Sequence, residues 1–268
     1  MSTQSITIYT EADFACLRKA GQLAAMTLDY ITPFVKEGVT TLELDGLCHR
    51  FILDNGAKSA TVGYQPQYAA SAYPFATCIS LNHVICHGFP DNRRLEKGDI
   101  FNLDITVELD GWFGDSSRMY TVGKPKVLAA KLIKATYDAM WRGIDAVRPG
   151  AHLGDIGYAI QSTVEPLGFS VVYEFCGHGI GRKFHQAPSV MHIGRKGQGQ
   201  QMKPGMVFTI EPMINAGKPQ GLFLSNGWTC ITRDRSLSAQ FEHQVGVTKD
   251  GYEVFTRSPK GWEYPPYD

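Results

Sequence analysis

Residues 98–118, GDIFNLDITVELDGWFGDSSR, carry the clearest structural signal in the chain. They predict a β-strand, an Asp-Gly hairpin turn at 110–111 and a returning strand. With that turn, Thr106 pairs with Asp115, and Asp104 lies on the same face, diagonal to Asp115 at about 7–8 Å between Cβ atoms. The hairpin is therefore predicted to bring two carboxylates together.

The residues next to these carboxylates in sequence are core-type, namely Ile100, Phe101, Leu103 and Ile105. The carboxylate pair is therefore predicted to face a partly buried place. Because unpaired buried carboxylates repel each other and are costly to desolvate, the arrangement needs a cation. The alternative is two aspartates on a solvated sheet face.

Composition narrows the functional classes. With 268 residues the chain can form one sizeable core, as one domain or two. Its 43% hydrophobic and 19% charged residues are ordinary for a soluble globular protein. Because 26 Lys plus Arg balance 26 Asp plus Glu, no overall positive field favours nucleic acid or an anionic membrane, and neither partner is expected.

The N-terminus lacks the basic and apolar regions of a signal peptide, and no run of about eighteen apolar residues occurs. A cytoplasmic location is predicted. The 6 cysteines form no CxxC pair and are expected to be buried thiols rather than disulfides or a zinc site.

The chain is predicted to consist of an N-terminal arm, 1–9, and a single domain, 10–268. That domain has two internal halves, about 10–123 and 124–256. Hydrophobic periodicity and capping signals predict amphipathic helices at 10–33, 40–55, 127–147 and 153–167.

An internal repeat relates the halves. GDIFNLD at 98–104 aligns without a gap on GMVFTIE at 205–211, and both stretches end in an acid, Asp104 and Glu211. If the halves pack about a pseudo-twofold axis, these carboxylates approach the centre from opposite sides.

Two further segments offer chemically active side chains. FCGHGIGRKFHQAP at 175–188 places His178 and His185 beside glycines that permit close approach, and LSAQFEHQVGV at 237–247 contains Glu242. The alternatives are histidines that serve only the core or surface, and an edge-strand glutamate on a solvated face.

One imidazole and four carboxylates suit a divalent transition ion such as cobalt, manganese, iron or zinc. Four carboxylates carry more charge than one dication balances. Two ions about 3.5–4 Å apart would offset that charge and hold a hydroxide between them. The predicted chemistry is hydrolysis of a carbonyl compound.

Five motifs follow one another along the chain: HGFP at 87–90, LDITVELDGWFGDSSRMY at 103–120, FCGHGIGRKFHQAP at 175–188, FTIEPMIN at 208–215 and GWTCITRDRSLSAQFEH at 227–243. Together they resemble the type I methionine aminopeptidases in their short bacterial form, which belong to peptidase family M24. The resemblance implies the pita-bread fold, an α/β fold of two pseudo-symmetric halves with a central antiparallel sheet and outer helices. It also implies removal of the initiator methionine from nascent polypeptides when the second residue is small, by attack of a metal-bridging hydroxide on the scissile carbonyl.

The same resemblance implies roles for individual residues. The implied metal ligands are Asp104, Asp115, His178, Glu211 and Glu242, of which Asp115 and Glu242 bridge two ions. Glu211 is also implied as the general base. His87 would hydrogen-bond the scissile amide nitrogen or the amine end of the substrate, and His185 would stabilise the developing oxyanion.

The implied methionine pocket has an apolar, polarisable lining that suits a thioether. Its residues are Tyr64, Tyr73, Cys78, Phe184 and Trp228. A monovalent-cation site found in some members corresponds to Asn82, Val84 and Ser238. Two features depart from the family pattern: the segment 65–72 is longer, and Thr61 stands where many members have a cysteine.

Three rival functions are open. The first is another pita-bread peptidase, such as an aminopeptidase P or a prolidase, which usually has an extra N-terminal domain. The second is a binding protein that has lost catalysis, which would lack the metal ligands. The third is a two-metal phosphoesterase, which calls for basic residues around the acids. A monomer is expected.

Overall fold

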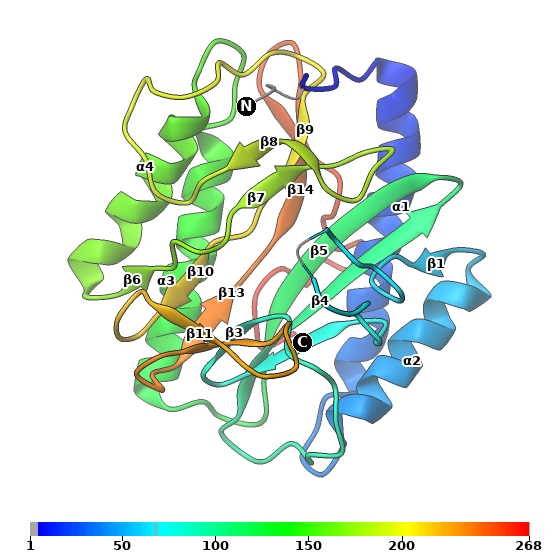
Figure 1. Cartoon of the computed structure of the whole chain (residues 1–268), viewed down its shortest axis with the longest axis vertical. Helices are drawn as coiled ribbons and strands as arrows, with labels where there is room; N and C mark the ends of the chain where they lie inside the picture. The colour runs from blue at the N-terminus through cyan, green and yellow to red at the C-terminus, as the bar shows by residue number, and fades with distance from the viewer. Residues whose placement is uncertain (1–4, 68, 268) are drawn as a thin grey trace.

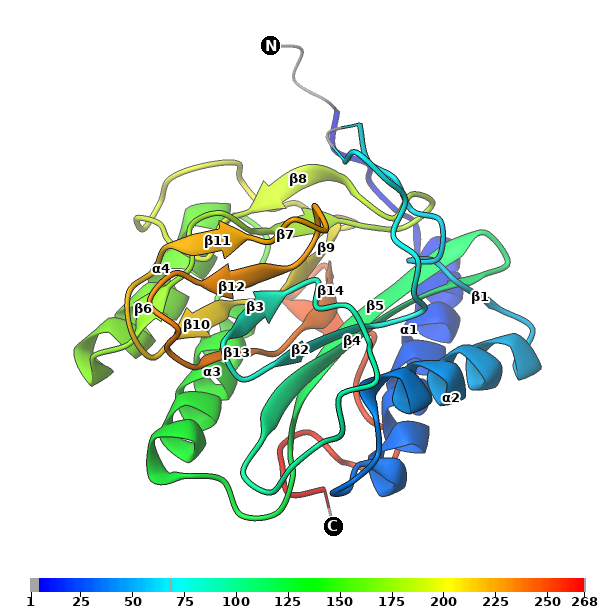
Figure 2. The same ribbon diagram turned by 60° about the horizontal axis from the view of Figure 1, so that its bottom comes forward.

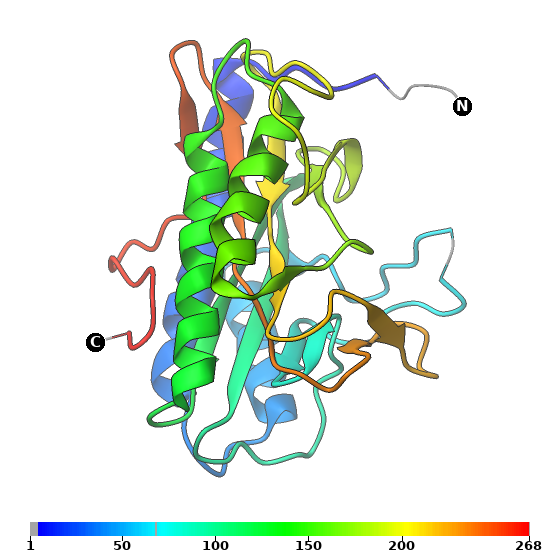
Figure 3. The ribbon, with the colours of Figure 1, turned by 90° about the vertical axis from the view of Figure 1, so that its left-hand side faces the viewer.

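The computed structural model describes residues 5–67 and 69–267. Helices lie on one face of a set of antiparallel sheets, and long loops and short strands project from the other face (Figures 1 and 3). Of the predicted arm, residues 1–4 lie outside the described residues, and 5–10 run without regular structure to the first helix. Residue 268 also lies outside them.

The α-helices follow the predicted pattern: α1 (Glu11–Ile31), α2 (Thr41–Asp54), α3 (Val127–Asp145) and α4 (Leu153–Val164), with short 3-10 turns at Thr32–Phe34 and Glu165–Leu167. Both predicted capping boxes are present. The Thr10 hydroxyl accepts the backbone N–H of Asp13, and Thr40 does the same for Glu43. These caps satisfy helix N–H groups that have no intrahelical partner, so both helices begin where the sequence predicts.

The strands form four sheets within the described residues. One sheet contains β1 (Lys58–Ser59), β2 (Cys78–Leu81), β4 (Ile100–Leu109) and β5 (Trp112–Thr121). A second contains β6 (Ser170–Val171), β10 (Met213–Asn215) and β13 (Ser238–Gln240). A third contains β3 (Val84–Cys86), β11 (Gly221–Phe223) and β12 (Cys230–Thr232), and the fourth β7 (Gly177–Gly179), β8 (Gln186–Val190), β9 (Val207–Ile210), β14 (His243–Val247) and β15 (Tyr252–Val254).

The β4–β5 hairpin has the predicted register, with Thr106 opposite Asp115. Its turn residues Asp110 and Gly111 have φ angles of 52° and 74°. Positive φ at both positions matches the right-handed twist of the flanking strands, and Asp-Gly tolerates it well. The turn therefore determines the register, which in turn determines the face on which each carboxylate lies.

The aligned stretches of the two predicted halves make the same backbone interactions. Gly98 and Gly205 have φ angles of 92° and 89°. The N–H of Gly98 donates to the carbonyl of Val122 at 2.8 Å, and the N–H of Gly205 donates to that of Val247 at 2.9 Å. This recurrence supports the predicted division of the domain into related halves.

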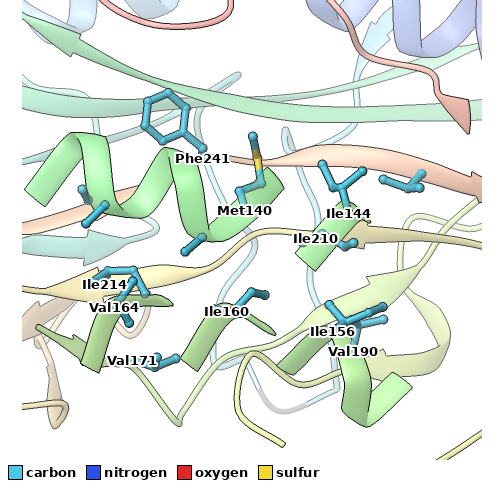
Figure 4. Close-up of a cluster of buried hydrophobic side chains, with 14 of the residues drawn as sticks. Met140, Ile144, Ile156, Ile160, Val164, Val171, Val190, Ile210, Ile214 and Phe241 are labelled. Atoms are coloured by element: carbon cyan, nitrogen blue, oxygen red, sulfur yellow. The ribbon is translucent and has the colours of Figure 1, made fainter. Parts of the chain in front are cut away.

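Each pair of helices covers its own apolar core. Between α3, α4 and the neighbouring strands, the fully buried Ile144, Ile160 and Ile210 belong to a cluster of buried side chains that Figure 4 shows in close-up. A second cluster lies under α1 and α2 and includes Leu28, Leu44 and Phe101. In Figure 2, α3 and α4 lie at the left of the central strands and α1 and α2 at the right, so each helix pair supports one part of the sheets that carry the predicted ligands.

Within the described residues, none of the helices has the length and apolar character that a bilayer crossing requires.

Candidate metal centre

A single cavity of about 260 Å³ brings together all the side chains that the sequence predicted for metal binding, catalysis and the methionine pocket. These lining residues are Tyr64, Tyr73, Cys78, His87, Asp104, Asp115, His178, Phe184, His185, Glu211, Trp228 and Glu242. A larger hollow of about 740 Å³ lies beside residues 187–203 and contains none of these residues.

The hairpin contributes Asp104 from β4 and Asp115 from β5. Asp115 is 3% exposed, which excludes the solvated sheet face as an explanation. The hydroxyl of Thr106 donates to Asp115 Oδ1 at 2.8 Å, and the backbone N–H of Asp115 donates to Gln244 Oε1 at 3.2 Å. Asp115 Oδ2 is directed toward His178 Nε2, 3.5 Å away.

His178 comes from the short strand β7, next to β9, which leads to Glu211. Its Nε2 lies 3.6 Å from Glu211 Oε1, and its Nδ1 lies 3.2 Å from the carbonyl oxygen of Gly179. Because a carbonyl can only accept, Nδ1 carries the hydrogen and Nε2 has its lone pair free for a metal ion. A backbone carbonyl thus determines the tautomer, as is common for metal-bound histidines.

Glu242 occupies a break between β13 and β14 and is 2% exposed. The solvated edge-strand alternative is therefore wrong for this residue. Its backbone forms an isolated antiparallel bridge with Ser117, which joins it to the carboxylate hairpin. The flanking side chains also turn toward the site, since Gln240 Nε2 lies 3.4 Å from Glu211 Oε2 and Gln244 accepts from Asp115.

The electrostatics of the carboxylates call for a cation. Burial, together with neighbouring carboxylates, raises the pKa of Asp104 and of Glu242 well above the usual range. Burial raises the pKa of Glu211 to about 7, although His178 and Thr209 act in the opposite direction. A bound dication would reverse these shifts by favouring the charged forms.

The donor atoms fit a divalent ion. One ligand atom each from Asp115, His178 and Glu242 lies within 4.8 Å of the others. Metal–ligand bonds of about 2.0–2.2 Å place ligands on opposite sides of an ion at about 4.4 Å, so this spacing suits a shared ion. Carboxylate oxygen and imidazole nitrogen suit first-row transition metals. Asp104 and Glu211 line the same cavity and complete the predicted ligand set.

Two further histidines line the cavity as neutral donors or acceptors. Burial lowers the pKa of His87 to about 4, only partly offset by a backbone hydrogen bond with Trp228. His185 is exposed at the cavity mouth, yet the protein packed around its ring and the neighbouring histidines His178 and His87 lower its pKa as well. Both imidazoles are therefore uncharged near neutral pH.

Aromatic rings form the apolar wall of the cavity. The rings of Tyr73 and Trp228 meet edge to face at 5.2 Å, and those of Tyr64 and Phe184 lie 4.8 Å apart. Cys78 is opposite Asp104 in the β2–β4 pairing, so the thiol wall adjoins the carboxylates.

The longer segment 65–72 is closed at its base by the backbone of the two tyrosines that flank it. The N–H of Tyr73 donates to the carbonyl of Tyr64, and the N–H of Gly63 donates to the carbonyl of Tyr73, both at 2.8 Å. The extra residues therefore leave both tyrosines in the cavity wall. Residue 68 within this segment lies outside the described residues. Thr61, the other departure, also lines the cavity.

The residues predicted for a monovalent cation lie outside this cavity lining. The carbonyl of Asn82 accepts the N–H of Ser238 at 2.8 Å, and the Asn82 side chain donates to Asp99. Val84 pairs with Ile231 in the β3–β12 ladder. The structure thus brings Asn82 and Ser238 into contact.

Several residues of the site were not foreseen from the sequence. Thr209 donates to Glu211 Oε1 at 2.7 Å and accepts the N–H of His178 at 3.0 Å. His192 accepts the N–H of Glu211, and Phe175 and Met213 add apolar lining. Only Thr209 had a usable signal, because it lies two positions before Glu211 and so on the same strand face.

A cavity between two α/β halves that gathers carboxylates and imidazoles, three of them with the spacing of metal ligands, is typical of a metal-dependent hydrolase. The comparisons agree with that class: residues 15–249 match the profile of Metallopeptidase family M24. The methionine aminopeptidase of Rickettsia prowazekii is 55% identical over 264 residues, which cover 98% of this chain and 100% of the relative. That of Escherichia coli K12 is 48% identical, with 94% of each chain covered.

The fold agrees as well. The crystal structure of the Rickettsia prowazekii methionine aminopeptidase matches with a TM-score of 0.91 over 94% of this chain and 100% of that one. The chain therefore belongs to metallopeptidase family M24, and within it to the methionine aminopeptidases. The predicted pita-bread fold is confirmed.

Proposed function

We propose that this protein removes the N-terminal methionine from polypeptides whose second residue is small, using two divalent metal ions. The observation that carries the proposal is the cluster of Asp115, His178 and Glu242 in the same cavity as an aromatic pocket. The relatives named methionine aminopeptidase support the same substrate.

The proposed ligand set is Asp104, Asp115, His178, Glu211 and Glu242. Asp115 and Glu242 would bridge the ions because both are buried and lie at the junction of the halves. Cobalt, manganese, iron and zinc all suit these donors. When bound, the ions supply Lewis acidity that activates water and polarises the scissile carbonyl.

Glu211 is the proposed general base. Its Oε1 accepts the Thr209 hydroxyl and its Oε2 lies 3.4 Å from Gln240 Nε2, so both oxygens are held in place for taking the proton from the attacking water. Because Glu211 lines the cavity among the proposed metal ligands, its carboxylate could accept that proton and pass it to the leaving amine.

The two neutral histidines are proposed to orient the substrate. His185, at the mouth, would donate to the carbonyl oxygen and stabilise the charge that develops there. His87 would hydrogen-bond the scissile amide nitrogen or the amine end of the substrate. Because both have lowered pKa values, they act without adding charge that would compete with the metal ions.

The apolar wall is proposed to hold the methionine side chain. A thioether is stabilised by contact with aromatic rings and with polarisable sulfur. These wall groups do not require a hydrogen bond from the methionine side chain. The wall residues are Tyr64, Tyr73, Cys78, Phe184 and Trp228. We also propose that Asn82, Val84 and Ser238 form a site for a monovalent cation.

The proposed partners are the N-termini of nascent polypeptides at the ribosome, in the cytoplasm. We propose a monomer that needs neither nucleic acid nor a membrane for activity. The described cysteines are free thiols, which suits a reducing compartment.

The test is methionine release from Met-Ala-Ser and Met-Leu-Ser peptides by chelated protein, before and after addition of cobalt or manganese. Cleavage of the first peptide alone, and only with metal, would support both the metal site and the specificity. Cleavage of neither peptide by protein that has bound metal would contradict the proposed function. Equal cleavage of both would contradict the specificity for a small second residue.

A further inference from the structure

The N-terminal arm contacts the loop that carries His185. Tyr9, the second residue before α1, is 8% exposed, and its ring meets that of Trp112 edge to face at 5.7 Å. Its backbone N–H donates to the carbonyl of Gly205 at 2.8 Å. Tyr9 is therefore held by both its ring and its backbone, and its hydroxyl has a defined position.

That hydroxyl accepts hydrogen bonds from two residues that precede and follow the tip of the loop 180–185 between β7 and β8. The backbone N–H of Arg182 donates to Tyr9 Oη at 3.2 Å, and Gln186 Nε2 donates to it at 2.9 Å. The approach is so close that a Cβ atom on Gly181 would overlap the tyrosine ring. Glycine at this position therefore permits the contact.

The tip of this loop presents Phe184 and His185 to the cavity. The ring centroids of His185 and His178 lie 4.0 Å apart, so a small movement of the loop changes the position of His185 relative to the metal ligands. Arg182 and Lys183 are exposed, whereas the rings of Phe184 and His185 contact the ring of Tyr64, with centroids 4.8 and 5.1 Å away. Tyr64 thus holds this pair on the cavity side, and the Tyr9 hydroxyl holds the backbone before the pair and the side chain after it.

We propose that the Tyr9 hydroxyl is a positioning group for His185, because it accepts hydrogen bonds from residues on both sides of this imidazole along the chain. The inference rests on the proposed function of the cavity and adds a residue that touches neither the substrate nor a metal ligand. Correct placement of an oxyanion donor acts on the chemical step, so the effect belongs to kcat.

Tyr9→Phe removes only the hydroxyl oxygen. The matched control is Tyr252→Phe on strand β15, which removes a hydroxyl that donates to Asp145 at the end of α3. With Met-Ala-Ser and saturating cobalt, Tyr9→Phe should lower kcat about tenfold, short of the ~100-fold that a 1 Å misplacement can cost. KM and cobalt affinity should change less than about twofold. Tyr252→Phe should behave like the unmodified enzyme.

A double-mutant cycle with His185→Ala isolates the mechanism. If Tyr9 acts through His185, Tyr9→Phe should cause no further loss of kcat in the His185→Ala protein. Equal losses in both backgrounds, or no loss in either, would overturn the proposal.

Hydrogen–deuterium exchange separates this inference from the proposed function. Amides of residues 181–186 should exchange faster in Tyr9→Phe than in the unmodified protein, whereas Tyr252→Phe should leave them unchanged. Unaltered exchange in Tyr9→Phe would overturn the positioning role even if no peptide were cleaved. Absence of metal-restored cleavage by the unmodified protein would instead contradict the proposed function.

Discussion

Ser117 and Glu242 form a single antiparallel bridge between the two halves of the protein. The N–H of Glu242 donates to the carbonyl of Ser117 at 3.1 Å, and the hydroxyl of Ser116 donates to the carbonyl of Glu242 at 2.8 Å. The bridge lies two positions from Asp115 along the chain. It therefore brings together Asp115 and Glu242, which come from segments more than a hundred residues apart and each offer an oxygen within 4.8 Å of the other.

Asp115→Asn should abolish metal-restored cleavage, because it removes a charge that the proposed ions need while preserving the shape of the side chain. Cobalt affinity, measured by isothermal titration calorimetry, should fall with it. Asp110→Asn is the matched control on the same hairpin. Asp110 is exposed to solvent and has a φ angle of 52°, a conformation that asparagine tolerates well, so this variant should keep its activity. Normal metal content with substantial activity in Asp115→Asn would count against the proposed ligand set.

Thr209→Val should weaken cobalt affinity by about 10–100-fold, as loss of a group that orients metal ligands typically does. The hydroxyl of this fully buried residue bonds both Glu211 and His178, and valine can serve neither. Thr209→Ser keeps the hydroxyl and should restore most of the affinity in the same titration. If serine and valine weaken binding equally, then packing of the methyl group, and not the hydrogen bonds, is what matters.

Asp29→Asn should lower the free energy of unfolding by about 3–5 kcal/mol, because it leaves the charge of Arg118 buried without its partner. The two side chains are 4% and 2% exposed, and Arg118 Nη1 lies 2.6 Å from Asp29 Oδ1. Urea unfolding monitored by circular dichroism measures the change. The control is Asp138→Asn, which breaks the exposed pair with Lys134 and should cost less than about 0.5 kcal/mol. Equal effects of the two substitutions would show that burial does not strengthen the Asp29–Arg118 pair.

Asp99 should make stability depend on pH in the acid range. Burial alone would raise the pKa of Asp99, but hydrogen bonds from Arg93, Asn82 and the N–H of Glu96 lower it below the usual value. A group with a lowered pKa in the folded state stabilises the protein fully above its unfolded pKa of about 3.9, and this contribution is lost as pH falls through the folded pKa.

The difference in unfolding free energy between the unmodified protein and Asp99→Asn should therefore be largest near pH 6 and should shrink below about pH 4. Its maximum should be only about 1 kcal/mol, because the Arg93 side chain is 40% exposed and solvent screens the ion pair. Urea titrations at several pH values measure it. A difference that stays constant from pH 6 to pH 3 would show that the charge of Asp99 plays no part.

Secondary structure could be predicted from the sequence wherever it depends on interactions between residues close together in the chain. The capping boxes at Thr10 and Thr40 and the Asp-Gly turn involve atoms only a few residues apart, so helix starts and the hairpin register follow from the sequence. The same holds for the face shared by Thr106 and Asp115. The resemblance of five motifs then supplied the candidate residues, including those on other segments.

What the tertiary structure alone decided is how these segments meet. Taken alone, the sequence around Glu242 favoured a glutamate on an exposed strand face. In the structure Glu242 is buried and forms a backbone bridge with Ser117 of the hairpin. The roles of Thr209 and Tyr9 likewise depend on contacts between segments distant in sequence. Periodicity and turn chemistry report interactions within one element. Burial, pKa shifts and ligand spacing depend on the packing of several elements, which no single stretch of sequence contains.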